Sequence, residues 1–173
     1  CPRTLWVSGG TIAADGETNE VIENYIRESS VASTSGTLVD HPGRWAGMQS
    51  ILRHVELLDF HNAPVSAISA GAGLRLRVQV ELPDDIKTVH VSAGLHDSMG
   101  DRVASLSSLF QDSFEHGLQR FAVICEIPSV PLVPGRYFVW LWVEHGKSKV
   151  DVIEGAAGFE VIPSDFFGSS RLP

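Results

Sequence analysis

The strongest constraint on the fold of this chain is a strict alternation of apolar and polar side chains between residues 74 and 82. Apolar residues occupy every second position: Leu74, Leu76, Val78, Val80 and Leu82. The positions between them are all polar: Arg75, Arg77, Gln79 and Glu81. A period of two places alternate side chains on opposite faces of an extended strand, so this segment predicts a half-buried β-strand.

The same period recurs along most of the chain after Gln49. Asp97 and Gly100 are the first and fourth residues of a stretch typical of a type I turn. No βαβ rhythm or internal repeat is visible. The pattern predicts an all-β fold, an immunoglobulin-like antiparallel β-sandwich of about seven strands. Besides 74–82, the expected strands are 51–57, 88–96, 102–107, 120–127, 137–144 and 159–162.

Residues 1–30 differ in pattern and predict an appendage. Two short apolar segments, Thr4–Val7 and Thr11–Ala14, flank a Ser-Gly-Gly turn and predict a hairpin. Thr18 can cap a helix that follows. The apolar stripe of this helix would be Val21, Ile22, Tyr25 and Ile26. A unit of this size cannot bury a core alone, so it is interpreted as the end of a larger domain.

The other boundaries follow from composition. Residues 31–48 are rich in Ser, Thr, Gly and Pro without a period, which predicts a linker. Residues 49–163 are assigned to the sandwich and residues 164–173 to a C-terminal tail. Under this assignment, deletion of residues 1–45 should leave the sandwich folded.

Composition and motifs exclude several functions. The chain has 173 residues and a net charge of -8, with no cluster of Lys and Arg, so nucleic acid is not an expected partner. There is no phosphate-binding loop, no nucleophile elbow and no group of histidines at metal-ligand spacing. Glu126 and Glu144 are conceivable as the carboxylate pair of a glycosidase, but two solvated strand residues are the preferred interpretation. No catalytic residue, metal or cofactor is therefore expected.

The two cysteines do not form a disulfide framework. Cys125 is expected to be a buried, small apolar residue. Cys1 is expected to be a cut site in a longer chain rather than a lipidated terminus, because an apolar strand follows at once.

The most unusual feature is an aromatic row in Arg136–Val143. Alternation places Phe138, Trp140 and Trp142 on one face of this strand. The aliphatic face suits the interior, and soluble proteins rarely leave such an apolar row without a partner. The residues assigned to the inner face are Tyr137, Val139, Leu141 and Val143.

A row of flat rings suits sugars, because the C–H face of a pyranose stacks on an indole. In an immunoglobulin-like order, the strand 88–96 lies beside this row. His90, Ser92 and His96 would then offer hydrogen bonds to a glycan, and Gly94 would leave a shallow gap. The alternative is that the linker, the C-terminal tail or a second subunit covers the rings.

Two stretches resemble known families. Residues 1–16 (CPRTLWVSGGTIAADG) and 20–25 (EVIENY) look like the end of an ABC-transporter ATP-binding domain. The Walker and signature motifs of that family have no counterpart here, so no nucleotide-binding residue is carried over.

The second resemblance covers most of the remaining chain. Its motifs are 54–59 (HVELLD), 74–78 (LRLRV), 97–100 (DSMG), 131–137 (PLVPGRY) and 157–168 (AGFEVIPSDFFG). This order is similar to the C-terminal carbohydrate-binding domain of Wzt-type ATP-binding subunits, which export O-antigen polysaccharides.

The resemblance implies non-catalytic recognition of a polysaccharide for export. It also implies a homodimer that works with a membrane-spanning permease at the cytoplasmic face of the bacterial inner membrane. The segment Phe159–Phe167 is expected to contribute to the dimer interface. A dimerisation or docking domain, with its rings buried by protein, is the alternative function.

Overall fold

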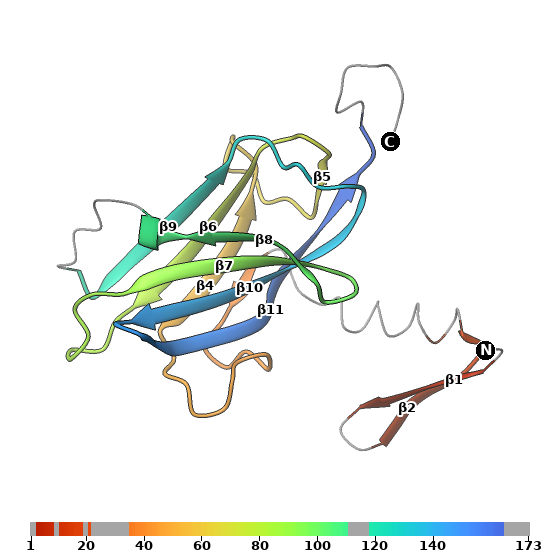
Figure 1. Ribbon diagram of the computed structural model, residues 1–173, viewed down its shortest axis with the longest axis horizontal. Coiled ribbons are helices and arrows are strands. Elements are labelled where there is room, and N and C mark those ends of the chain that lie inside the picture. Colours follow the sequence, from red (N-terminus) through yellow and green to blue (C-terminus); the bar gives the residue numbers. More distant parts are fainter. Residues whose placement is uncertain (1–2, 9–10, 19–20, 22–34, 111–117, 165–173) are drawn as a thin grey trace. The chain divides into compact units, whose positions relative to one another are not determined.

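The computed structural model describes residues 3–8, 11–18, 21, 35–110 and 118–164 (Figure 1). The chain divides into two compact units, residues 1–32 and 33–173. In the first unit, β1 (Thr4–Ser8) pairs with β2 (Thr11–Gly16) in an antiparallel hairpin, as predicted. Arg3 and Asp15 form an exposed ion pair beside it. The helix expected after Thr18 lies almost entirely outside the described residues.

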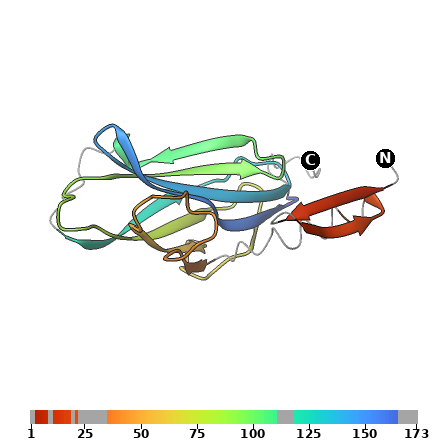
Figure 2. The same cartoon turned by 90° about the horizontal axis from the view of Figure 1, so that it is seen from below.

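The second unit contains two sheets that form two layers (Figures 1 and 2). The five-stranded sheet has the order β5-β11-β10-β7-β8, and the four-stranded sheet has the order β3-β4-β6-β9. All pairs are antiparallel except β11 with β5. The strands are β3 (Ser35–Thr37), β4 (Leu52–Leu58), β5 (Ala67–Ser69), β6 (Leu74–Glu81), β7 (His90–Asp97), β8 (Arg102–Ser107), β9 (Arg120–Ile127), β10 (Gly135–His145) and β11 (Ser148–Ile162). A single 3-10 turn, η1 (Ser108–Phe110), follows β8.

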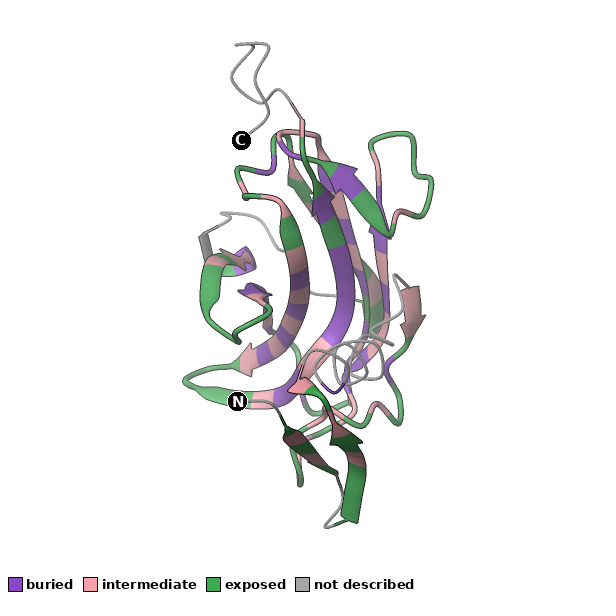
Figure 3. Ribbon diagram, turned by 90° about the vertical axis from the view of Figure 1, so that its right-hand side faces the viewer, coloured by how far each residue is buried: buried purple, intermediate pink, exposed green. Residues whose placement is uncertain are grey.

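One apolar core lies between the two sheets. Alternate residues of β6 enter it, and their exposed fractions are all 3% or less: Leu74, Leu76, Val78 and Val80. In the other sheet, β10 contributes Tyr137, Val139, Leu141 and Val143, the residues predicted for its inner face. Figure 3 shows the resulting bands of buried and less buried residues along the strands. Burial of alternate side chains therefore fixes which face of each strand looks outward.

The all-β class is confirmed, whereas the expected immunoglobulin-like arrangement of about seven strands is not confirmed for these two sheets. The described residues form nine strands in them. β3 and β5 are only three residues long, too short to show a period. β11 extends over 15 residues, although only 159–162 was expected. Its earlier part was not expected because bulges interrupt the alternation of apolar and polar residues there. Gly155, with a φ of 62°, lies within this irregular stretch.

The predicted linker is also too long. Residues 35–48, assigned to it by composition, belong to the second unit. β3 pairs with β4, and Leu38 is fully buried in the core. Residues 43–49, called the strap below, then run along β11. The strap was missed because it is held by backbone and charged groups rather than by an apolar period.

Candidate binding surface

The outer faces of the two sheets have different chemistry. On the four-stranded sheet, arginines and glutamates pair with one another across neighbouring strands. The pairs are Arg53–Glu81, Arg120–Glu81, Arg77–Glu56 and Arg75–Glu126, with N–O distances between 2.5 and 3.3 Å. Most of the charge on this face is therefore paired within the sheet, and exposed pairs of this kind contribute little to stability.

The outer face of the five-stranded sheet carries aromatic residues instead. Phe138, Trp140 and Trp142 project from β10, opposite to its buried aliphatic face, and each ring is half-buried. β10 pairs directly with β7, which confirms the expected neighbour of the row. In register, Phe138 faces His96, Trp140 faces Gly94 and Trp142 faces Ser92. We call the three rings the aromatic row.

Each ring of the aromatic row contacts a cationic or aromatic neighbour. His96 stacks on Trp140, with ring centroids 4.1 Å apart and planes at 14°. The Arg136 guanidinium lies 5.8 Å from the centre of the Phe138 ring, and the Lys149 ammonium lies 5.3 Å from the centre of the Trp142 ring. Each contact favours the observed orientation of its ring. A stacked partner also means that a ligand can approach Trp140 only on the ring face away from His96.

Two of the three expected polar residues are less accessible than predicted. Ser92 is 2% exposed and its hydroxyl is hydrogen-bonded to the Ser107 hydroxyl at 2.8 Å. His96 is 7% exposed and its Nδ1 lies 3.1 Å from the carbonyl oxygen of Gly100. Both residues are therefore buried rather than standing open beside the rings, and His96 supports Trp140.

The expected gap at Gly94 is absent. A side chain added there would meet the His96 ring nitrogen at 2.9 Å and the Arg102 side chain at 3.2 Å. Gly94 instead gives His96 the room to fold over toward Trp140. The packing of two neighbouring side chains over a glycine is not readable from alternation alone.

His90 is the most accessible member of the expected polar set. It is half-buried, and it faces Glu144 of β10 in register. Its Nδ1 is buried, with no hydrogen-bond partner in the described part of the chain. A ligand would therefore meet the other edge of this ring.

The strap adds a residue that the sequence analysis did not single out. Trp45 is 44% exposed, and its indole N–H donates to the Glu154 carboxylate at 2.9 Å. The Lys149 ammonium lies 6.0 Å from the centre of the Trp45 ring, so the same cation contacts both Trp45 and Trp142. A lone Trp in a polar stretch was the available signal, but composition assigned the stretch to a linker.

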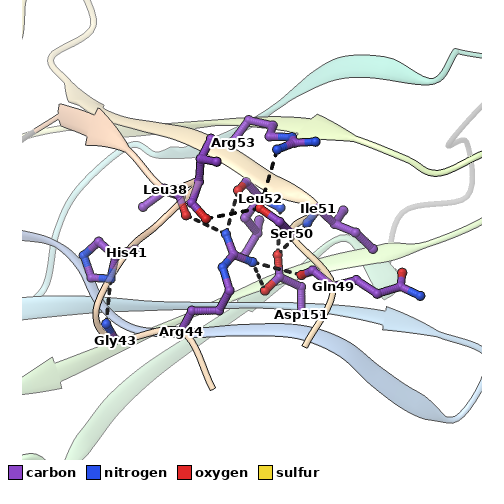
Figure 4. Close-up of polar contacts among 11 residues, drawn as sticks. Leu38, His41, Gly43, Arg44, Gln49, Ser50, Ile51, Leu52, Arg53 and Asp151 are labelled. Carbon is purple, nitrogen blue, oxygen red and sulfur yellow. Dashed lines mark hydrogen bonds and ion pairs between the residues drawn. The ribbon is translucent and has the colours of Figure 1, made fainter. Parts of the chain in front are cut away.

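A buried ion pair holds the strap (Figure 4). Asp151 of β11 is fully buried and pairs with Arg44. The same carboxylate accepts the backbone N–H groups of Ile51 and Leu52 at 2.9 and 2.8 Å. Arg44 also donates to the carbonyl oxygens of Leu38, Gln49 and Leu52 at distances between 2.6 and 3.0 Å. Because both charges are paired and hydrogen-bonded, their burial is tolerated.

Comparison with known proteins identifies the family. The sequence-family model described as the Wzt C-terminal domain matches residues 44–172, most of the chain. The chain belongs to the Wzt C-terminal domain family. A crystal structure of the C-terminal domain of Wzt is similar in fold, with a TM-score of 0.59. It is 13% identical in sequence, and the match covers 70% of this chain and 78% of that one. No curated protein sequence matches the chain.

Membership of the Wzt C-terminal domain family places the chain in an O-antigen ABC transporter and in a non-catalytic class of domain. The hypothetical glycosidase pair does not assemble in this Wzt C-terminal domain. Glu126 lies on β9, where it pairs with Arg75, whereas Glu144 lies on β10 of the other sheet. Among the described residues, no group of His, Cys, Asp or Glu could hold a metal ion. No helix within them is long and apolar enough to span a membrane.

The Wzt C-terminal domain also has a cleft of about 420 Å³ between its sheets. The cleft lies beside β8 and β9, the edge strands of the two sheets, and Cys125 and Ser107 are among the residues that line it. Burial raises the pKa of the Cys125 thiol, and the nearby Glu126 carboxylate adds to the effect. Cys125 is half-buried rather than fully buried. A raised pKa keeps more of the thiol protonated at neutral pH, which disfavours a nucleophilic role for Cys125.

Proposed function

We propose that the sandwich binds the glycan cargo of an O-antigen ABC transporter along the aromatic row, without catalysing a reaction. The observation that carries the proposal is the contrast between the two outer faces. One carries arginines and glutamates in ion pairs, whereas the other presents Phe138, Trp140 and Trp142 in a line. An apolar row of this kind on a surface calls for a partner.

The geometry suits a chain of sugars better than a single small molecule. Residues of one face repeat every two positions along a strand, which is about 6.6 Å. The row therefore extends about 13 Å from Phe138 to Trp142. Stacking on successive rings would supply most of the binding free energy. His90 at one margin, with Glu144 and Lys149 beside it, would hydrogen-bond the hydroxyl groups, while His96 holds Trp140 from below.

The wider role follows from the family and from the N-terminal resemblance. Residues 1–30 would be the end of an ATP-binding domain, and the ATP-binding subunits would pair as a homodimer with a permease at the cytoplasmic side of the inner membrane. A glycan held on a preformed surface has a high local concentration at the transporter. The sandwich would thus select the cargo to be exported.

Hydrogen–deuterium exchange tests where the glycan lies. The probe is the O-polysaccharide released by mild acid from the lipopolysaccharide of the source organism. We expect it to slow exchange in β10 and β7 and to leave β6 and β9 unchanged. Protection confined to β6 and β9, or to the cleft beside β8 and β9, would overturn the proposed surface.

A further inference from the structure

We propose that the strap is part of the glycan-binding surface, with Trp45 as a fourth stacking ring and with Gly43 and Arg44 as positioning residues. This inference rests on the proposed function and extends it. It assigns a role to Gly43, Arg44 and Trp45, which composition alone marks as part of a linker.

The first argument is the register of the strap. It behaves as an additional edge strand beside β11. The backbone N–H of Trp45 donates to the Val152 carbonyl oxygen at 3.0 Å, and the backbone N–H of Gln49 donates to the Val150 carbonyl oxygen at 2.9 Å. In the other direction, Glu154 N–H donates to the Gly43 carbonyl at 2.9 Å. The strap thus extends the sheet order from β10 through β11 to a further strand.

The second argument is the face on which Trp45 lies. Arg44 bridges to Ile153, which is fully buried, and the Arg44 side chain turns inward to Asp151. Successive residues of an extended chain point to opposite faces, so Trp45 points outward. Its contacts with Glu154 and with Lys149, which also caps Trp142, place it on the face of the aromatic row.

The third argument is distance. β10, β11 and the strap are successive neighbours, so Trp45 and Trp142 are separated by two strand spacings, about 10 Å. The aromatic row runs along β10, whereas the line from Trp142 to Trp45 runs across the strands. Lys149 lies along that line and can donate to an acidic or hydroxyl group of the ligand. The binding surface therefore turns at Trp142 and suits a glycan of several units.

The fourth argument is that the residues before Trp45 hold the backbone of the strap in a defined position. A Cβ at Gly43 would overlap the Glu154 backbone oxygen, so only glycine lets the strap approach β11 this closely. The residue before Trp45 is Arg44, whose buried pair with Asp151 anchors the strap to β11 and to the start of β4. The exposed indole is thus held from two directions.

The test is calorimetric titration of wild type, Trp45→Ala, Trp45→Phe and Trp142→Ala with the same O-polysaccharide. Phe60→Ala is the matched control, because Phe60 is 40% exposed and has the Arg75 guanidinium 5.4 Å from its ring centre, away from the proposed surface. We expect Trp45→Ala to weaken binding at least fivefold, Trp45→Phe to restore most of it and Phe60→Ala to change nothing.

The outcomes separate the two proposals. If Trp142→Ala weakens binding and Trp45→Ala does not, the strap inference fails and the aromatic row stands. If wild type does not bind, or binds and neither Trp variant is affected, both proposals fail.

Gly43→Ala tests positioning. It should weaken binding as much as Trp45→Ala, and the double variant Gly43→Ala/Trp45→Ala should bind no more weakly than either single variant, because both act through one ring. Additive losses would show that Gly43 does not act through Trp45, and an unaffected affinity would show that it does not position the ring.

Discussion

Single residues on β10 divide sharply between core and surface. Leu141 is fully buried among the residues of both sheets, whereas its neighbours Trp140 and Trp142 are half-buried on the outer face. The period of two makes this division predictable from the sequence, because one face of the strand is wholly aliphatic apart from Tyr137. The period could not predict how exposed the polar residues of the neighbouring strand β7 are. Ser92 and His96 alternate correctly to the outer face, yet both are buried, Ser92 against Ser107 of β8 and His96 under Trp140 of β10.

Replacement of Leu141 should separate stability from binding. Leu141→Ala is expected to lower the free energy of unfolding by about 2–5 kcal/mol, because it opens a cavity in the core. Trp142→Ala should lower it by less, since that ring keeps part of its surface in water. Urea denaturation of both variants measures the difference, and a larger loss for Trp142→Ala would mean that the faces of β10 are inverted.

The buried carboxylate of Asp151 should be far more important for stability than an exposed one. Asp151→Ala is expected to destabilise the fold by about 3–5 kcal/mol, because Arg44 is left as an uncompensated buried charge. Glu126→Ala is the control, since its side chain is 53% exposed. It should cost at most about 1 kcal/mol. Equal losses in the two unfolding curves would contradict the role assigned to the Arg44–Asp151 pair.

At the scale of elements, the long alternating strands were predictable and the short or irregular ones were not. β6, β7 and β10 carry a clean period and were located from sequence. β3 and β5 have three residues each, and bulges disturb β11. The strap was missed for another reason: its stability comes from Arg44 and Asp151, which are 107 residues apart in sequence. A single sequence does not indicate which charges meet across such a separation.

Two deletions should define where the sandwich begins. Removal of residues 1–32, up to the boundary between the two units, is expected to leave the unfolding transition nearly unchanged. Removal of residues 1–45 should destabilise the sandwich by more than about 3 kcal/mol, because it also removes Leu38 and Arg44 and leaves Asp151 unpaired. Denaturation of the two products, compared with the full chain, measures both effects. A stable product after removal of 1–45 would restore the linker assignment.

The strap should also respond to pH through His41. Its Nδ1 accepts the Gly43 N–H at 3.1 Å, which requires an unprotonated nitrogen. Burial, assisted by the charge of Arg44, lowers the pKa of His41 below 6.5. Because the folded-state pKa is depressed, the stabilisation is present above pH 6.5 and is lost as pH falls through the folded pKa. The melting-temperature difference between wild type and His41→Ala should therefore shrink from pH 7 to pH 5, and a constant or growing difference would exclude this bond as the cause.

At the scale of the whole molecule, the second unit is a Wzt C-terminal domain whose two outer faces differ in kind. The outer face of β4, β6 and β9 carries arginine–glutamate pairs, whereas the face of β10, β7 and the strap presents aromatic rings and the Lys149 ammonium that Trp45 and Trp142 share. Covering these rings with a second subunit, rather than with sugar, would make the domain a dimerisation element. The proposed homodimer is compatible with glycan binding only if its interface leaves the aromatic row open.

Titration with the released O-polysaccharide tests the central claim, glycan binding along the aromatic row, most directly. Wild type should bind saturably, and Trp140→Ala and Trp142→Ala should each lose more than about 1 kcal/mol of binding free energy while remaining folded. Leu141→Ala, measured where it is still folded, should bind like wild type. Saturable binding that is unchanged in both tryptophan variants would contradict the account.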